Sequence, residues 1–305
     1  MRAPTVDAGA LSEPMIEAVA REERRGRLLT ALLLAPSTLW FVALLVMPLA
    51  VVVVFSLGER APAGGYAPAF TLAQYLNLPA RWTAFKNTLT LAPIGTVICL
   101  AAAYPFAYYL ALRADRRSKL ALLMLVIVPF WTSFLIRTYA WIYILGGRGL
   151  PALLAWLGLP DVRLINTPFA VLIGIVYAYL PLMIFPIYVS LERLDKRLLE
   201  ASDDLGASPL RTFLQVTLPL SAPGVITGCM LVFILLMGEY LIPDMLGGGK
   251  VFFIGNALVD LFLQSRNWPF GSAVAVGLVA VMLLTVTLYL RVTRRSAAAP
   301  DVSLM

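Results

Sequence analysis

The sequence predicts an all-α integral membrane protein with six transmembrane helices. Of its 305 residues, 60% are hydrophobic and 13% are charged, and the mean hydropathy is +0.85. A soluble domain carries about 25% charged residues. Six apolar runs are long enough to cross a bilayer, which takes about 20 residues. They cover residues 28–57, 88–112, 120–145, 168–191, 220–243 and 270–290.

The distribution of basic residues predicts that both termini and the 192–219 loop are cytoplasmic. Two thirds of the 24 Lys and Arg residues fall in the tails and loops that this orientation places inside. This set comprises Arg2, Arg21, Arg24, Arg25, Arg27, Arg113, Arg116, Arg117, Lys119, Arg193, Lys196, Arg197, Arg211, Arg291, Arg294 and Arg295. Cytoplasmic loops of membrane proteins carry such an excess. The net charge of +7 is therefore a topology signal, so the expected partner is the lipid bilayer and not nucleic acid.

The N-terminal segment predicts a tail followed by a retained first span. Residues 1–27 mix proline, glycine and charges without apolar periodicity, which indicates a tail that is mostly disordered or interfacial. The next run, at about 30 residues, is too long for the apolar core of a signal peptide. Pro36 and Pro48 predict kinks in this span. Residues 58–86 form an outer loop, with a short amphipathic piece at 70–78.

The third and fourth runs carry aromatic residues and prolines. The third run follows a basic turn at 113–119 and becomes aromatic toward its outer end, at Trp131, Tyr139 and Trp141. Aromatic residues of this kind are typical of the belt at a membrane surface. The fourth run, 168–191, contains two prolines, which predict a broken or kinked helix.

Glycines in and after the fifth run predict close packing and a turn. Gly224 and Gly228 lie four residues apart, a spacing that allows close helix approach, within the bundle or, as the second option, between subunits. The segment 247–250 has only a superficial likeness to a phosphate loop, because Asp244 and Val251 occupy two positions that the motif requires. We therefore expect no ATPase in this chain.

Residue composition excludes several kinds of chemistry. The chain contains no histidine, which excludes zinc-type sites and Ser-His-Asp or Cys-His catalysis. Cys99 and Cys229 both lie within predicted spans, so neither a disulfide framework nor a metal site is expected.

The polar segment 192–219 predicts a docking element for another protein. Gly206 divides two short helices, and Ser208 and Pro209 are suited to the N-cap and the first position of the second helix. A charged helix–turn–helix between two apolar runs is more than a plain connection needs. The alternative is an amphipathic interfacial helix without a partner.

The same segment resembles the EAA loop of ABC-importer permeases, in which Glu-Ala-Ala is followed by three residues, Gly, nine residues and Ile-x-Leu-Pro. Glu200, Ala201 and Ser202 match the first part, Gly206 the second, and the segment from Val216 to Leu218 and Pro219 the last. The departures, Ser202 for Ala and Val216 for Ile, keep the register. Within that superfamily, four further segments resemble the spermidine/putrescine type: 87–89, 129–141, 238–243 and 246–249.

The resemblance covers most of 28–295 and implies a type I ABC-importer permease domain there, flanked by cytoplasmic tails at 1–27 and 296–305. It implies a second homologous permease, two cytoplasmic ATPase subunits and a periplasmic substrate-binding protein, in a bacterial inner membrane. The chain itself would be non-catalytic and bind no cofactor, with ATP and Mg on the partner ATPase.

The expected function is that of a permease subunit that moves a small organic cation, a polyamine such as spermidine or putrescine, into the cell by alternating access. Alternatives are the same machinery importing an amino-acid derivative or an organophosphonate, and an ion-coupled secondary transporter. The latter folds often contain internal repeats, and none is evident here. An intramembrane enzyme is a further class, for which the sequence offers few chemical groups.

Two groups of residues are candidates for function. In the loop, Glu200 is expected to contact the ATPase or cap the loop, Gly206 to allow a tight turn, and Leu218 and Pro219 to end the loop helix. In the spans, Glu239 is the one carboxylate well inside an apolar run, and intramembrane acids are functional candidates.

Glu239 has two candidate roles, and the remaining option is that it has neither. Counted along straight helices, it and Arg137 lie about 26–29 Å above the start of their spans, so they can form a structural ion pair. Alternatively, Glu239 faces a cationic substrate, whose ammonium groups can also contact aromatic faces. The aromatic candidates are Trp131, Tyr139, Trp141, Tyr177 and Tyr179.

Overall fold

The computed structural model describes residues 13–160 and 162–297, which are helical apart from one two-stranded hairpin and the connecting loops. The chain divides into two units, one ending at Val54 and one beginning at Phe55. Of the predicted tails, residues 1–12 and 298–305 lie outside the described residues. Residues 13–27, expected in a tail that is mostly disordered or interfacial, form the start of a long helix.

The first unit consists of α1, the helix Glu13–Ser56 up to the unit boundary. Its apolar stretch, Leu29–Ser56, is long enough to cross a bilayer. The side chains described along this stretch up to Val54 are exposed or half-exposed within the chain. Exposure of so many leucines and valines fits a helix surrounded by lipid or by other membrane helices. Pro36 and Pro48 lie inside the helix without ending it.

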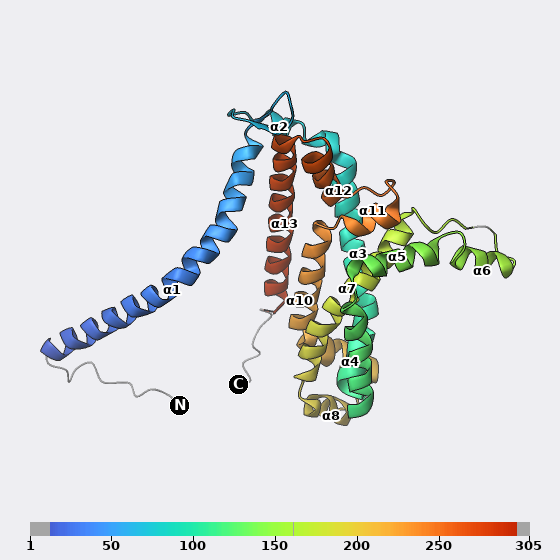
Figure 1. Cartoon of the computed structure of the whole chain (residues 1–305). Helices are drawn as coiled ribbons and strands as arrows, with labels where there is room; N and C mark the ends of the chain where they lie inside the picture. Colours follow the sequence, from blue (N-terminus) through green and yellow to red (C-terminus); the bar gives the residue numbers. More distant parts are fainter. Residues whose placement is uncertain (1–12, 161, 298–305) are drawn as a thin grey trace. The chain divides into compact units, whose positions relative to one another are not determined.

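The second unit contains all the remaining elements (Figure 1). Its N-terminal part comprises β1 (Glu59–Arg60), β2 (Tyr66–Ala67), α2 (Ala73–Leu76), η1 (Leu78–Arg81), α3 (Trp82–Tyr108), η2 (Tyr109–Arg113), α4 (Arg116–Phe130), α5 (Phe134–Leu145) and α6 (Leu150–Trp156). The C-terminal part comprises α7 (Pro168–Glu192), α8 (Lys196–Asp204), α9 (Pro209–Thr212), η3 (Phe213–Thr217), α10 (Leu218–Met237), α11 (Leu241–Gly247), α12 (Ile254–Val259), η4 (Asp260–Gln264) and α13 (Trp268–Ala297).

The core of this unit lies between α3, α7 and α10, which run side by side (Figure 1). Small residues allow these helices to approach closely. A Cβ on Gly228 would lie 2.9 Å from the Met183 sulfur, and one on Gly224 would overlap Pro186 and Ser190 of α7. The two glycines of the fifth run therefore serve packing within the chain, the first of the two uses that the sequence allows.

The third span differs from the prediction because α4 and α5 meet at an angle of 93°. Only when this bent pair is counted as one span do the described residues contain six candidate spans; otherwise they contain five. The break follows Pro129, and the Thr132 hydroxyl donates to the Pro129 carbonyl at 2.7 Å. Such a local side-chain bond competes with the helical ladder. The third span expected over 120–145 is therefore not one straight helix.

The fourth span is not broken, one of the two forms expected for it, and the fifth span is shorter than expected. α7 is one helix from Pro168 to Glu192 although Pro181 and Pro186 lie inside it, because its packing against α3 and α10 outweighs the lost ladder bonds. Conversely, α10 ends at Met237, so residues up to 243 do not extend the fifth span.

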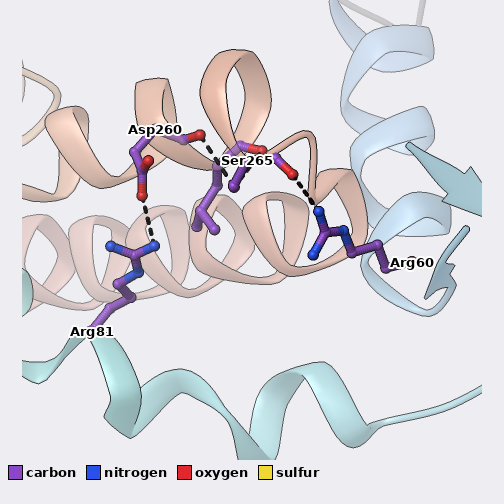
Figure 2. A network of polar contacts seen from close by, with 5 residues as sticks. Arg60, Arg81, Asp260 and Ser265 are labelled. Carbon is purple, nitrogen blue, oxygen red and sulfur yellow. Dashed lines mark hydrogen bonds and ion pairs between the residues drawn. The ribbon is translucent and has the colours of Figure 1, made fainter. Parts of the chain in front are cut away.

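At the end of the bundle where α2, α12 and the start of α13 lie (Figure 1), polar contacts join several loops (Figure 2). The Arg81 guanidinium forms an ion pair with Asp260 at 2.7 Å. The Ser265 hydroxyl donates to the Asp260 carbonyl at 3.2 Å, and the Ser265 carbonyl accepts from Arg60 at 2.8 Å. These contacts tie the β1–β2 hairpin and η1 to η4, although the segments are far apart in sequence.

Candidate functional site

The 192–219 loop contains the predicted helix–turn–helix. Asp195 caps α8 by accepting from the Arg197 amide at 3.0 Å, and Ser208 caps α9 by accepting from the Arg211 amide at 3.4 Å. Gly206 between them has a φ of +76°, a conformation that residues with a Cβ rarely adopt. The turn and its cap are thus confirmed at Gly206 and Ser208.

The EAA-like residues divide into one that braces the loop and two that face outward. The Ser202 hydroxyl hydrogen-bonds the Thr212 hydroxyl at 2.9 Å, which joins α8 to α9. Glu200 and Ala201 are exposed. Because Asp195 and Ser208 provide the caps, Glu200 does not cap the loop, which leaves an external contact as its expected role.

The loop helix does not end at Leu218 and Pro219, as the sequence analysis expected. Helical structure runs from Pro209 through the π-helical turn η3 into α10 and on to Met237. Pro219 cannot donate an amide hydrogen, and η3 ends two residues before it, at Thr217, where a wider turn accommodates the missing bond. The loop is therefore directly continuous with a membrane helix.

Leucines give the loop an apolar outer surface. Leu205 is 88% exposed and Leu210 is 69% exposed, on either side of Gly206. Leu198 and Leu214 are also exposed. Such a group of large apolar side chains on a polar, charged element is typical of a surface that binds another protein.

At the opposite end of α10, Glu239 lies in a break formed by Gly238, Glu239 and Tyr240, here called the Glu239 break. The Glu239 side chain is 7% exposed. One carboxylate oxygen, Oε1, accepts from the backbone amides of Leu241 at 2.8 Å and Ile242 at 3.2 Å. The other, Oε2, accepts from the Tyr179 hydroxyl of α7. The carboxylate therefore caps α11 and binds it to α7.

The proposed ion pair between Arg137 and Glu239 is not formed. Within the described residues, the Arg137 guanidinium lies over the rings of Phe130 and Phe134, at 5.3 and 5.6 Å, and its buried Nε has no hydrogen-bond partner. Two helix breaks invalidate the equal-depth argument. α5 turns away from the direction of α4, and Glu239 lies beyond the end of α10.

The five aromatic candidates lie in different surroundings. Trp131 and Tyr139 are 81% and 60% exposed. Trp141 and Tyr177 meet edge to face, with ring centroids 5.5 Å apart. Tyr179 is bound to Glu239. The structure thus brings together Trp141 and Tyr177, but it does not gather all five around one cavity.

A second set of polar residues, all of them uncharged, supports the Glu239 break. The Asn256 side chain donates to the Tyr240 carbonyl at 2.7 Å, and its oxygen accepts from the Phe253 amide at 3.0 Å. The Thr88 hydroxyl accepts from the Ile254 amide at 2.9 Å, and Asn256 and Thr88 are both buried. Sequence analysis missed Asn256, whose only signal was an amide side chain in an apolar segment.

The described residues contain no group of three His, Cys, Asp or Glu side chains that could hold a metal ion. The polar groups described above have other partners. Glu239 binds backbone amides and Tyr179, Ser202 binds Thr212, and Glu200 is exposed. At both places these contacts join one helix to another.

Comparisons with known proteins agree with this picture. The family model for "Binding-protein-dependent transport system inner membrane component" matches residues 103–298. The chain is 42% identical to the spermidine/putrescine transport system permease protein PotB of Haemophilus influenzae, over 84% of this chain and 91% of the relative. Identity to PotB of Escherichia coli is also 42%, over 84% and 94%. An inner membrane ABC transporter permease protein of E. coli, YdcU, is 33% identical over 76% and 77%.

Solved structures share the fold. A bacterial ABC transporter involved in the import of the acidic polysaccharide alginate matches with a TM-score of 0.71 at 18% identity, covering 91% of this chain and 99% of that chain. The MetNI methionine ABC transporter matches with a TM-score of 0.52 at 18% identity, over 72% and 96%. At this identity the likeness concerns the fold alone.

Proposed function

The chain belongs to the family of inner membrane components of binding-protein-dependent transport systems, and from this premise we propose that it imports a polyamine such as spermidine or putrescine. As a member it is a non-catalytic permease subunit with the type I ABC-importer architecture. Membership removes the secondary transporter and the intramembrane enzyme as alternatives. The observation that carries the substrate proposal is the 42% identity, over most of both chains, to permeases named for spermidine and putrescine.

The proposed assembly contains a second homologous permease, two cytoplasmic ATPase subunits and a periplasmic binding protein. ATP and Mg belong to the ATPase subunits. We place both termini and the 192–219 loop in the cytoplasm, because basic residues are concentrated there. Labelling of a single cysteine at Asp203, in a chain lacking Cys99 and Cys229, tests this orientation. Labelling by an impermeant reagent from outside the cell would contradict it.

We assign ATPase docking to the outer surface of the 192–219 loop. Exposed Leu205 and Leu210 provide apolar contact area, and exposed Glu200 offers a charge for a contact across the interface. Ser202 keeps the two helices together, so that the loop moves as a unit. Because α9 continues into α10, a push on the loop reaches the membrane helices directly.

Aromatic faces are the groups proposed for contact with the ammonium groups of a polyamine. A cation over an aromatic ring gains about 0.5–1 kcal/mol at an exposed site and about 2 when desolvated. Exposed Trp131 and Tyr139 and the Trp141–Tyr177 pair are suited to this contact. The carboxylate of Glu239 is already occupied within the chain and is not part of this set.

Uptake by the assembled transporter tests the substrate. The four components are reconstituted in proteoliposomes with ATP inside, and uptake of radiolabelled spermidine, putrescine, an amino-acid derivative and an organophosphonate is compared. We expect uptake of a polyamine that requires both ATP and the binding protein. Selective uptake of one of the other solutes would favour the runner-up, the same machinery with a different cargo.

A further inference from the structure

We propose that Glu239 is a positioning residue that fastens the end of α10 to α7 and α11, so that movement of α10 is transmitted to the end of the bundle remote from the 192–219 loop. The source of that movement, ATPase action on the loop, rests on the proposed function. The fastening itself rests on contacts within the chain.

The first element of the argument is an uninterrupted helical connection. Residues Pro209–Met237 form 29 continuous helical residues. At a rise of about 1.5 Å per residue, this length corresponds to about 43 Å, enough to cross the hydrocarbon layer. Movement of α9 therefore displaces the far end of α10, where the helix stops at Gly238.

The second element is the way in which the chain resumes after that stop. An ionised carboxylate only accepts hydrogen bonds, and Glu239 receives three, from the Leu241 and Ile242 amides and from the Tyr179 hydroxyl. The first two hold the start of α11 at a fixed angle to the break. The third comes from the middle of α7, so one side chain joins three helices.

The third element is the packing behind the break, which prevents it from acting as a free hinge. A Cβ on Gly255 of α12 would lie 2.8 Å from the Gly238 carbonyl oxygen, so α12 lies directly against the break. Asn256 binds the Tyr240 carbonyl, and Thr88 of α3 holds the start of α12. A cationic substrate would have to displace these contacts to reach a side chain that is 7% exposed.

Substitutions separate positioning from substrate contact. Glu239→Gln keeps an oxygen for the two amides and places an NH2 group where it can donate to the Tyr179 oxygen, so it preserves the geometry without the charge. Glu239→Ala removes all three bonds, and Tyr179→Phe removes one. Tyr143→Phe, on an exposed tyrosine of α5, is the matched control.

The measurement is the number of substrate molecules transported per ATP hydrolysed, together with the substrate concentration at half-maximal rate. We expect Glu239→Ala to lower the coupling ratio about tenfold and Tyr179→Phe about threefold, with that concentration unchanged, because no ground-state substrate contact is lost. Glu239→Gln and Tyr143→Phe should stay near wild type. Loss of transport in Glu239→Gln, or a raised half-maximal concentration, would overturn the proposal in favour of substrate contact. A parallel fall of ATPase activity and transport in Tyr179→Phe would also overturn it.

A readout without substrate keeps the inference separate from the proposed function. Spin labels are placed at Leu220 on α10 and Asp244 on α11, both exposed, in a chain lacking Cys99 and Cys229. In the assembled complex we expect one narrow distance with or without a trapped nucleotide, and a broadened one in Tyr179→Phe and Glu239→Ala. Equal distributions in wild type and variants would refute the fastening even if polyamine uptake is confirmed. Absence of polyamine uptake with broadening in the variants would refute only the substrate.

Discussion

The continuous helix Pro209–Met237 has a glycine-containing break beyond each end, and the two breaks have different surroundings. At the 192–219 loop, Gly206 turns the chain and leaves large apolar and charged side chains exposed. At the Glu239 break, Gly238 ends the helix, and the polar groups that follow are buried and hydrogen-bonded within the chain. The comparison separates an element with an exposed surface, which suits the proposed external partner, from one whose polar groups are engaged within the chain. The loop leaves large apolar side chains exposed, whereas at the Glu239 break both carboxylate oxygens are hydrogen-bonded within the chain.

The largest expected effect comes from breaking the loop turn. Gly206→Trp forces a side chain into a left-handed conformation and places a bulky ring on the proposed docking surface, although no atom lies within 4 Å of its Cβ position. Holding a residue with a Cβ in the left-handed conformation costs about 1–2 kcal/mol. We expect ATP-driven uptake to be lost while the protein still inserts in the membrane.

Gly147→Trp is the control for this substitution, since Gly147 also has open space around its Cβ position but no positive φ. Transport and co-purification of the ATPase with the permease are measured for both variants. Wild-type transport by Gly206→Trp would show that the loop is not a coupling element.

A substitution on α12, which packs against the Glu239 break, disturbs the break without changing its charge. Gly255→Ala places a methyl group 2.8 Å from the Gly238 carbonyl oxygen, and overpacking of this kind costs about 1–3 kcal/mol. Gly277→Ala is the matched control, because the added methyl on α13 meets its neighbours at 3.7 Å. Thermal unfolding in detergent should show a lower midpoint for Gly255→Ala alone. Equal midpoints would indicate that α12 yields easily and does not brace the break.

A smaller effect is expected inside the loop. Ser202→Ala removes the hydrogen bond to Thr212 and restores the alanine of the EAA pattern. An ordinary hydrogen bond contributes about 0.5–1.5 kcal/mol, and here the lost bond joins two short helices. We expect a several-fold weaker affinity for the ATPase subunit, measured by titration of the purified permease. An unchanged affinity would mean that α8 and α9 dock independently of that bond.

The smallest effect concerns an exposed cap that belongs to neither region. Asp115 accepts from the amides of Arg117 at 3.2 Å and Ser118 at 3.5 Å at the start of α4. Hydrogen bonding from Ser118 lowers the pKa of Asp115. The carboxylate therefore adds stability above its unfolded pKa of about 3.9, and this contribution is lost as the pH falls through the lower folded value.

Comparison of wild type with Asp115→Ala across pH checks this cap. The difference in unfolding midpoint should be constant near neutral pH and should shrink only below about pH 4, the usual range for an aspartate. A difference that persists at lower pH would show that the aspartate acts by something other than its charge.

Local rules predicted the loop far better than the break. The Gly206 turn and the Ser208 cap depend on a few neighbouring residues, and so they can be read from the sequence. The six apolar runs likewise follow from composition. The partner of Glu239 cannot be predicted in this way, because counting residues along a helix assumes that the helix continues. Pro129 and Gly238 indicate in the sequence where a helix can end, but they do not determine the direction of the segment that follows.

Long-range contacts account for the remaining misses. Asn256 lies sixteen residues from the Tyr240 carbonyl that it binds, and Thr88 lies 166 residues from Ile254. No local pattern marks such pairs. The resemblance named 87–89 and 238–243 as signatures, and only the structure shows that both belong to one support around the Glu239 break.

The hydrogen-bonded loops of Figure 2 limit where a tag can be inserted into this protein. Arg60, Arg81, Asp260 and Ser265 join three loops, so an epitope tag inserted into any one of them would strain the other two. The exposed turn around Gly147 and Arg148 forms none of these contacts and is the better insertion point. A tag there would leave the native connections of the loops in Figure 2 intact.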